Sequence, residues 1–427
     1  MTCPPETLPM PSDGVERQTL LQLRGRFLTV NQGRMARAME GLAPHQQSLL
    51  RLLALCFHVN HPLLPGYVSD CTPAGVSGYE PDASTLGAAQ QLIRDFSCST
   101  SRACASKPIH GLFLMGSLGT LAQTDQSDMD VWICLGPDLS DMAVAALRKK
   151  CRRLEVWAAS LGVEAHFFLI DAQRFAQGEC DSQPSNDESA EPRNRLLLDE
   201  FYRTAIWLAG RTPMWWWVPA HQEARYAECA QGLLANDVVG RDETIDLGHL
   251  AQIAPAELLG AGLWQLFKGI ESPYKSVLKL LLVEVYASEH PRVNCLSMGF
   301  KKRVYADRLD LDELDPYVVV YRRIEQYLQG RGELQRLELV RRSLYLKVGH
   351  TLSSGATGMQ WQRLLLQRLT REWGWDEQQL AMLDNRSQWG AQQVSHELRA
   401  LARELSVSYR SLCTFARDER PSTELKR

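Results

Sequence analysis

Two stretches of the sequence combine residue types that bind phosphates and divalent cations. The first is Met115-Gly116-Ser117, where a glycine after an apolar run lets backbone N–H groups and a hydroxyl approach phosphate oxygens. The second is Ser127-Asp128-Met129-Asp130, in which residues two apart in a strand present two carboxylates on one face. Because such a pair repels itself unless a cation bridges it, the two stretches together predict a site for a metal-bound nucleoside triphosphate.

The Asp-x-Asp pattern alone is weak, since acidic pairs are common on solvated turns. Here the pair enters an apolar run, Val131 to Leu135, and follows the Gly-Ser strand end by about a dozen residues. The carboxylates of Asp128 and Asp130 are therefore expected at the rim of a sheet, beside the phosphate loop. Two Mg²⁺ ions about 3.5–4 Å apart could there clamp the attacking and leaving oxygens of a phosphoryl transfer.

A third acid is expected on a neighbouring strand. Glu164 stands between apolar residues in Val163-Glu164-Ala165-His166, and a carboxylate there could bind a metal and accept the proton of an attacking hydroxyl. The alternative is that Glu164 is an exposed residue at the strand end and that Asp171 closes the strand. His166 is expected to be structural.

Cations for the phosphates are expected farther along the chain. Ser272-Pro273-Tyr274-Lys275 is typical of a helix start, with Ser272 at the cap and Pro273 in the first turn. Lys275 and Lys279 would share a face of that helix and reach the β- and γ-phosphates. Lysines on a solvated helix face are an equally good interpretation. Arg203, on the polar edge of an amphipathic helix, is a further nucleotide-binding candidate.

The surrounding pattern predicts the elements that position these residues. Apolar runs over 109–115, 131–135 and 163–170 indicate three strands, and the three-to-four-residue spacing of Leu147, Cys151, Leu154 and Ala158 indicates a helix over 139–161. Helical spacing also covers residues 18–57, and a long ordered loop is expected over 61–84. Residues 177–194 are almost wholly polar and are predicted to be a mobile excursion. From Leu196 onward the pattern is strongly helical.

Two further clusters are expected to have structural roles rather than functional ones. The consecutive aromatics Trp215, Trp216 and Trp217 could stack a ligand, but between prolines they are more typical of core or interface. The run Lys301-Lys302-Arg303 is expected to be solvated charge.

Composition excludes several classes of protein. The formal net charge of −3 gives no field that would gather nucleic acid, and no apolar stretch reaches the ~20 residues of a membrane span. Eleven scattered cysteines without a Cys-x-x-Cys pair indicate reduced core residues, and the N-terminus does not resemble a secretory signal. A cytoplasmic protein is expected. No P-loop sequence is present.

The order of elements predicts an α+β fold in which a mixed sheet with helices is flanked by helical N-terminal and C-terminal regions. Residues 1–95 form a leader and a helical N-terminal layer in this interpretation. Residues 96–240 form the nucleotide-binding catalytic domain, and residues 241–427 form a helical domain that closes the nucleotide cleft.

At this level of detail the sequence resembles the class I adenylate cyclases of gammaproteobacteria, whose catalytic part belongs to the DNA polymerase beta-type nucleotidyltransferase superfamily. The resemblance spans roughly residues 30–417 in one order. Its blocks are 61–67, 115–117, 127–132, 157–164, 198–205, 263–266, 272–275, 339–342 and 381–386.

The resemblance implies an enzyme that converts ATP to 3′,5′-cyclic AMP and pyrophosphate with two Mg²⁺ or Mn²⁺ ions. Asp128 and Asp130 would hold both metals, Glu164 would complete the first, and Gly116 and Ser117 would bind the β- and γ-phosphates. Full-length family members carry a large regulatory C-terminal half, which is expected to be absent from this chain.

Two rival functions use the same residues. One is a nucleotidyltransferase that moves the nucleotidyl group to a separate protein, RNA or small-molecule acceptor. The other is a non-catalytic module that senses or docks ATP without reacting. Acceptor dependence and pyrophosphate release distinguish the three possibilities.

Overall fold

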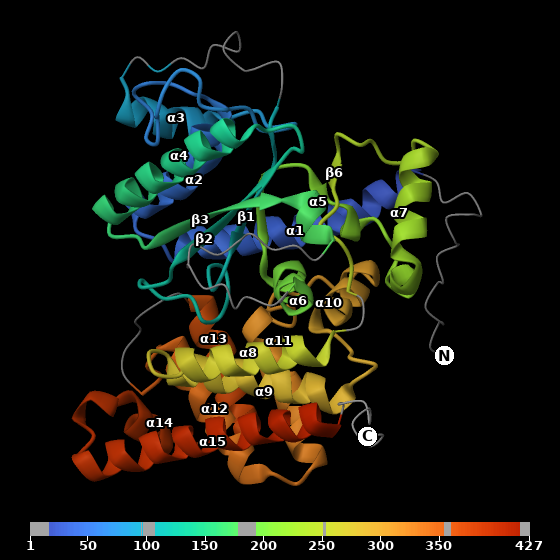
Figure 1. The fold of residues 1–427 in the computed structure, drawn as a ribbon. Coiled ribbons are helices and arrows are strands. Elements are labelled where there is room, and N and C mark those ends of the chain that lie inside the picture. Colours follow the sequence, from blue (N-terminus) through green and yellow to red (C-terminus); the bar gives the residue numbers. More distant parts are fainter. Residues whose placement is uncertain are drawn as a thin grey trace, which may run out of the picture.

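The computed structural model of the 427-residue chain describes residues 17–94, 96, 107–177, 194–250, 253–353 and 360–418. The predicted leader and nearly all of the predicted polar excursion over 177–194 lie outside these residues. In Figure 1 a sheet with its helices forms the upper half of the molecule, and a group of helices forms the lower half.

A four-stranded mixed sheet carries the residues of interest. Its order is β3-β2-β1-β4, with β1 antiparallel to both neighbours and β2 parallel to β3. The strands are β1 (Ile109–Met115), β2 (Met129–Leu135), β3 (Ala165–Asp171) and β4 (Ile206–Gly210). The parallel pair is joined through α4 (Asp141–Ser160), as parallel strands require a crossover. The predicted mixed α+β class is thus confirmed.

Strand β4 interrupts the strongly helical pattern expected from Leu196 onward. It follows α6 (Asn194–Thr204) directly and pairs with β1 through Leu114↔Ile206 and Phe113↔Trp207. A five-residue apolar run has no period that separates strand from helix, so its pairing partner decides its conformation.

The two faces of the sheet pack against different helices because successive side chains alternate. Leu112, Leu114, Val131 and Ile133 face a core with α2 (Pro44–His58) and α4. Phe113, Met115, Trp132 and Cys134 face a second core with α1 (Arg17–Glu40), α6 and the tryptophans 215–217. Those tryptophans are buried, which confirms that they are core rather than a ligand platform.

The remaining elements of the upper half are short. They are α3 (Ala83–Leu92), α5 (Ala172–Ala176), β5 (Thr212–Pro213), η3 (Met214–Trp216), η4 (Ala220–Arg225), α7 (Tyr226–Ala235) and β6 (Thr244–Ile245), with β5 and β6 forming a separate two-stranded ladder. The predicted ordered loop over 61–84 is present up to Asp82, whose side chain caps α3 by accepting from the Thr85 N–H at 2.7 Å.

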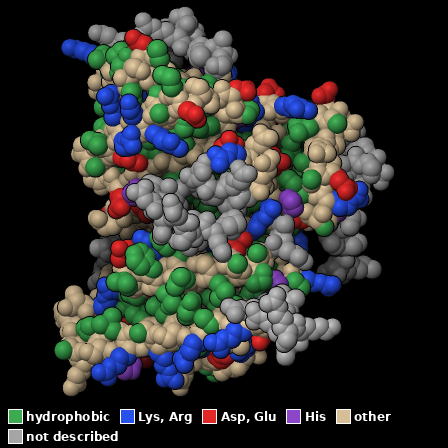
Figure 2. Space-filling view, in the orientation of Figure 1, with side chains coloured by type: hydrophobic (Ala, Val, Ile, Leu, Met, Phe, Trp, Pro, Cys, Tyr) green, Lys and Arg blue, Asp and Glu red, His purple; other side chains and the backbone are tan. Residues whose placement is uncertain are grey.

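The lower half is built from helices around their own apolar core. They are α8 (Pro255–Lys268), α9 (Pro273–Glu289), α10 (Leu296–Tyr305), α11 (Pro316–Gly330), α12 (Leu334–Val348), α13 (Gln360–Trp373), α14 (Glu377–Asp384), η5 (Arg386–Gln388) and α15 (Ala391–Asp418). Figure 2 shows hydrophobic side chains gathered over this half, where α8 exposes Leu263 and Phe267 and the turn after it exposes Ile270.

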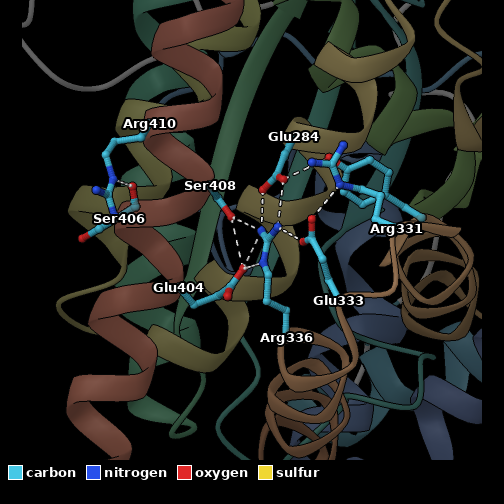
Figure 3. Close-up of polar contacts among 9 residues, drawn as sticks. Glu284, Arg331, Glu333, Arg336, Glu404, Ser406, Ser408 and Arg410 are labelled. Atoms are coloured by element: carbon cyan, nitrogen blue, oxygen red, sulfur yellow. Dashed lines mark hydrogen bonds and ion pairs between the residues drawn. The ribbon is translucent and has the colours of Figure 1, made fainter. Parts of the chain in front are cut away.

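A buried ion network joins three of these helices (Figure 3). Arg336 of α12 donates to Glu284 of α9 at 2.7 and 3.2 Å and to Glu404 of α15 at 2.8 Å. The two glutamate side chains are only 2% and 6% exposed, so their charges depend on this guanidinium. The network fixes the packing of α9, which carries Lys275 and Lys279.

Another expectation concerned the lysine run at 301–303. Lys301 is fully buried rather than solvated, and its ammonium lies 3.4 Å from Glu223 and 4.0 Å from the Trp215 ring centre. Burial lowers the pKa of Lys301 to about 8 despite the nearby Glu223. Across the described ranges, no helix is both long enough and apolar enough to cross a bilayer.

Candidate active site

The loop between β1 and β2 begins with a glycine that no other residue could replace without strain. Gly116 has a φ of +106°, a region that L side chains rarely adopt. A Cβ at this position would lie 3.8 Å from the Oδ1 of Asp128, so the acidic side chain lies beside the glycine backbone. Ser117 is buried, and its hydroxyl is 2.8 Å from that of Ser127. The two predicted stretches are therefore adjacent in space.

Asp128 and Asp130 occupy one rim of the sheet, as the spacing predicts. Asp128 directly precedes β2, Asp130 is the second residue of that strand, and both lie on the face that Trp132 continues into the α6 core. Burial, and then the charge of Asp128, raise the pKa of Asp130 to about 6, against the opposing effect of nearby cations. A divalent cation would relieve this disfavoured ionisation of Asp130.

Glu164 is placed next to this pair in register but points into solvent. Its carbonyl accepts from the Met129 N–H at 2.9 Å, while 74% of its side chain is exposed. Its carboxylate is 3.2 Å from the Nε2 of His166. Asp171 ends β3 and caps α5. These positions match the alternative interpretation, and the role of Glu164 as a third ligand stays a prediction. Within the described ranges, no three His, Cys, Asp or Glu side chains form a group that could hold a metal ion.

The predicted lysine pair lies on the first turns of α9, beside the acid pair. Ser272 and Pro273 take the predicted cap and first-turn positions, although the Ser272 side chain makes no capping hydrogen bond. The charges of Lys275 and Lys279 both lower the pKa of Asp130, so both lysines lie within electrostatic range of its carboxylate. Both are half-buried rather than solvated.

Lys279 already has an anionic partner within the protein. Its ammonium lies 2.9 and 3.1 Å from the two carboxylate oxygens of Glu200 on α6. Burial alone would raise the pKa of Glu200, but Lys279 and Arg203 outweigh it and lower that pKa to about 2. Lys279 is thus held in place by an ion pair, and Lys275 has the greater freedom to meet a ligand.

Arg203 lies deeper than the sequence interpretation assumed. Its residue is 8% exposed, its Nε is 3.6 Å from Asp199, and its carbonyl accepts from Arg34 at 3.4 Å. Asp199 in turn accepts from the N–H and hydroxyl of Ser297 at 2.9 and 2.6 Å. Arg203 therefore belongs to a buried polar network behind Glu200, and a direct contact with nucleotide remains a prediction.

One cation in this region was not predicted from the sequence. Burial lowers the pKa of Lys347 at the end of α12, and Lys275 lowers it further, while Asp128 raises it. The C-terminal end of α12 meets the loop that leads to Asp128, since a Cβ at Gly349 would lie 3.9 Å from the Cγ2 of Thr124. Lys347 stands in an unremarkable helical run, so no local pattern distinguishes it.

The assembled groups suit a polyphosphate with a divalent cation. Carboxylates at 128 and 130 supply hard oxygen ligands, the loop at Gly116 offers backbone close to them, and Lys275 and Lys347 supply positive charge from two helices of the lower half. Mg²⁺ is commonly bound in this way, through one or two carboxylates together with substrate phosphates.

Comparisons with known proteins agree with this chemistry. A family model described as the adenylate cyclase NT domain matches residues 19–216, and one described as the second domain of class-I adenylate cyclase matches residues 253–427. The chain is 40% identical to the adenylate cyclase of Escherichia coli K12 and 39% identical to that of Salmonella typhimurium LT2, in each case over 396 residues. It is 36% identical to that of Proteus mirabilis over 401 residues.

These alignments cover 92% of this chain but only 46–47% of the relatives, so the chain spans about half the length of the curated proteins it matches. No solved structure matches the fold significantly.

Proposed function

The chain belongs to the class-I adenylate cyclase family, and we propose that the site described above converts ATP to 3′,5′-cyclic AMP and pyrophosphate. The observation that carries the proposal is the position of the Asp128 carboxylate against Gly116, with Asp130 on the same face and Lys275 nearby. A reaction that splits a triphosphate needs a phosphate cradle, acidic metal ligands and cations within one site.

The reaction is a single displacement within one nucleotide. The ribose 3′-oxygen forms a bond to the α-phosphorus, the bond from that phosphorus to the oxygen bridging to the β-phosphate breaks, and the 3′-hydroxyl proton leaves to a base. Pyrophosphate carries away the displaced electron pair. Because both reacting groups belong to one molecule, the protein has mainly to orient the ribose and triphosphate and to neutralise charge.

The acid pair fits a divalent cation, which we propose to be Mg²⁺ or Mn²⁺, bound as two ions by Asp128 and Asp130. Burial and the charge of Asp128 raise the pKa of Asp130 although His166, Lys275 and Lys279 oppose them, and a bound cation would favour the ionised form. When bound, such ions would polarise the phosphate oxygens and favour ionisation of the 3′-hydroxyl. We propose Glu164 as a further ligand or proton acceptor only if its side chain turns from His166 toward Asp128, and Glu164→Gln tests that role.

The other residues bind and orient the substrate. Backbone N–H groups after Gly116 face the β- and γ-phosphates in this proposal, and Lys275 and Lys347 neutralise them. Lys279 and Arg203 act indirectly in this proposal, because both favour the ionised form of Glu200, and Glu200 holds Lys279 in an ion pair.

We further propose that the sheet is of the DNA polymerase beta-type nucleotidyltransferase kind. Support comes from two antiparallel strands, β1 and β2, joined by a loop that begins with Gly-Ser and ends with Asp-x-Asp. We expect β1, β2 and the loop between them to superpose on members of that superfamily with the acid pair coincident.

A product assay tests the function. Purified chain incubated with ATP and Mg²⁺ or Mn²⁺, without any acceptor, should yield cyclic AMP and pyrophosphate in equal amounts on chromatography. Turnover that needs an added acceptor would favour a nucleotidyltransferase. Metal-dependent ATP binding without pyrophosphate would favour a sensing module. Either result would overturn the cyclase proposal for this chain.

A further inference from the structure

One side chain from the lower half forms hydrogen bonds to the centre of the loop from Gly116 to Asp128. Gln362, on the first turn of α13, is completely buried. Its Nε2 donates to three backbone carbonyls of the loop, Thr120 at 3.1 Å, Leu121 at 3.0 Å and Gln123 at 3.1 Å. An amide nitrogen has two hydrogens, so one of them is shared between two carbonyls.

A second contact fixes the direction of this amide. The Gln362 Oε1 lies in hydrogen-bonding contact with the Nε2 of His350. Because an amide oxygen can only accept, His350 donates here and leaves the Gln362 nitrogen turned toward the loop. Gln362 therefore has both ends of its amide satisfied, and its rotation is blocked.

The same loop is held from its other side by a helix cap. The Leu121 N–H donates to the Oδ2 of Asp315 at 2.7 Å, while the Oδ1 of Asp315 caps α11. The Leu121 side chain is fully buried in the core of the lower half. Asp315 and Gln362 thus hold residues 120–123 from the lower half, while the Gln123 side chain also donates to the Ala38 carbonyl of α1 at 2.9 Å.

Further hydrogen bonds connect the central residues 120–123 and their neighbour Thr124 to the two ends of the loop, at Gly116 and at Asp128. The Thr120 hydroxyl donates to the Ser117 carbonyl at 2.6 Å, next to Gly116. The Thr124 N–H donates to the Ser127 hydroxyl at 3.0 Å, next to Asp128. A displacement of the centre would therefore move the phosphate-binding end and the metal-binding end together.

We propose that Gln362 is a positioning residue, which holds the loop 116–128 so that Gly116 and Asp128 face each other across the substrate site. The lower half thereby sets the geometry of a site whose carboxylates belong to the upper half. The catalytic consequence rests on the proposed cyclase function, whereas the effect on loop order does not.

The test compares Gln362→Met, which keeps the length of the side chain but removes the donors, with Gln360→Met, an exposed position on the same helix. Gln362→Met leaves the buried carbonyls of Leu121 and Gln123 without a donor, and leaves the Thr120 carbonyl with the Gln123 N–H alone. Amide hydrogen exchange over 116–128 should therefore accelerate while exchange in β2 and α9 stays unchanged. In the full 427-residue chain, well below its melting temperature, kcat should fall by about 10²-fold, with the KM for ATP changed less than about threefold.

Gln360→Met should leave both measurements at the wild-type value. A folded Gln362→Met protein with wild-type kcat and wild-type loop exchange overturns the inference. So does a variant whose whole loss of activity tracks its unfolded fraction.

If Gln362→Met does not fold, His350→Phe decides the matter. It removes only the bond that orients the amide, so faster exchange over 116–128 and a several-fold lower kcat are expected. Unchanged exchange in a folded His350→Phe protein overturns the inference. Should the wild type itself make no cyclic AMP while Gln362→Met still accelerates loop exchange, the cyclase proposal fails and the structural role of Gln362 stands.

Discussion

Asp130 lies directly opposite His166 in the parallel pairing of β2 with β3, and the two side chains leave the same face of the sheet. His166 is hydrogen-bonded to Glu164, so the imidazole interacts with a second acid besides Asp130. The rim of the sheet therefore carries more negative than positive charge on its own strands. The balance has to come from α9, from α12 or from a bound cation.

Removing the charge of Asp130 should stabilise the metal-free protein. Its folded-state pKa of about 6 lies above the ordinary aspartate value of 3.8, so the ionised form costs stability above pH 6, and that cost disappears as the pH falls toward 3.8. Asp130→Asn should gain about 2 kcal/mol in urea unfolding at pH 8 in EDTA, and less at pH 5. The exposed Asp125→Asn serves as the control. An equal gain at both pH values would contradict the assignment.

The same residue should be indispensable for turnover. Asp128→Ala and Asp130→Ala should each lower cyclic AMP formation by at least about 10³-fold, because a lost metal ligand removes stabilisation of charge in the transition state. Circular dichroism should remain that of the wild type. Substantial activity in either folded variant would refute the catalytic assignment, and Asp125→Ala should stay fully active.

Lys347 should contribute to substrate binding. Because it lies near Lys275 and Asp128, Lys347→Gln should raise the KM for ATP by about tenfold, the loss of one charge-assisted contact with phosphate. Lys268→Gln, at an exposed lysine paired with Glu271, provides the comparison and should change KM little. Steady-state kinetics at saturating metal measure both. An unchanged KM in Lys347→Gln would place this lysine outside the substrate site.

Gly119 should tolerate no side chain. It has a φ of +70°, and a Cβ there would overlap the carbonyl oxygen of Arg34. Gly119→Ala should lower the free energy of unfolding by roughly 2–4 kcal/mol, or prevent folding. In contrast, Gly299→Ala places a methyl group in open space on α10 and should stabilise by about 0.5–1 kcal/mol. Similar values for the two substitutions in urea unfolding would disprove the packing described for the loop.

Substitutions at the centre of the ion network of Figure 3 should destabilise the fold much more than substitutions at its exposed edge. Arg336→Met leaves Glu284 and Glu404 buried without their cation, and a loss of about 3–5 kcal/mol is expected. Arg331 is 52% exposed, forms an ion pair with Glu333 and lies over the Tyr327 ring, so Arg331→Met should cost only about 1 kcal/mol. Thermal unfolding of the two variants gives the comparison, and equal melting temperatures would be incompatible with the network.

The parts of the site that were predictable are those with a local signature. The strands around Gly116 and Asp130 follow from short apolar runs, and the observed bounds of β1, β2, β3 and α4 differ from the expected ones by two residues or fewer. The adjacency of Gly116 to Asp128 follows from two strand ends that share one rim. Both inferences use neighbours in sequence only.

The parts that were missed depend on contacts between distant segments. Lys347 lies in the site because α12 ends beside Thr124, and Gln362 because α13 inserts beneath the loop. Lys301 was expected in solvent, yet it is buried because Glu223 and Trp215, far away in the chain, surround its ammonium. Local charge runs carry no information about such partners, so sequence pattern alone assigns them to the surface.

Leu121 couples the packing of the two halves of the molecule. Its side chain belongs by sequence to the loop of the upper half but by packing to the apolar core of the lower one. If either half were exchanged for that of a relative, the residues on both sides of the interface would have to match. Otherwise the residue at position 121 would lack an apolar core to pack into. Recombination within this family should succeed where the crossover keeps Leu121 together with the helices whose core it enters.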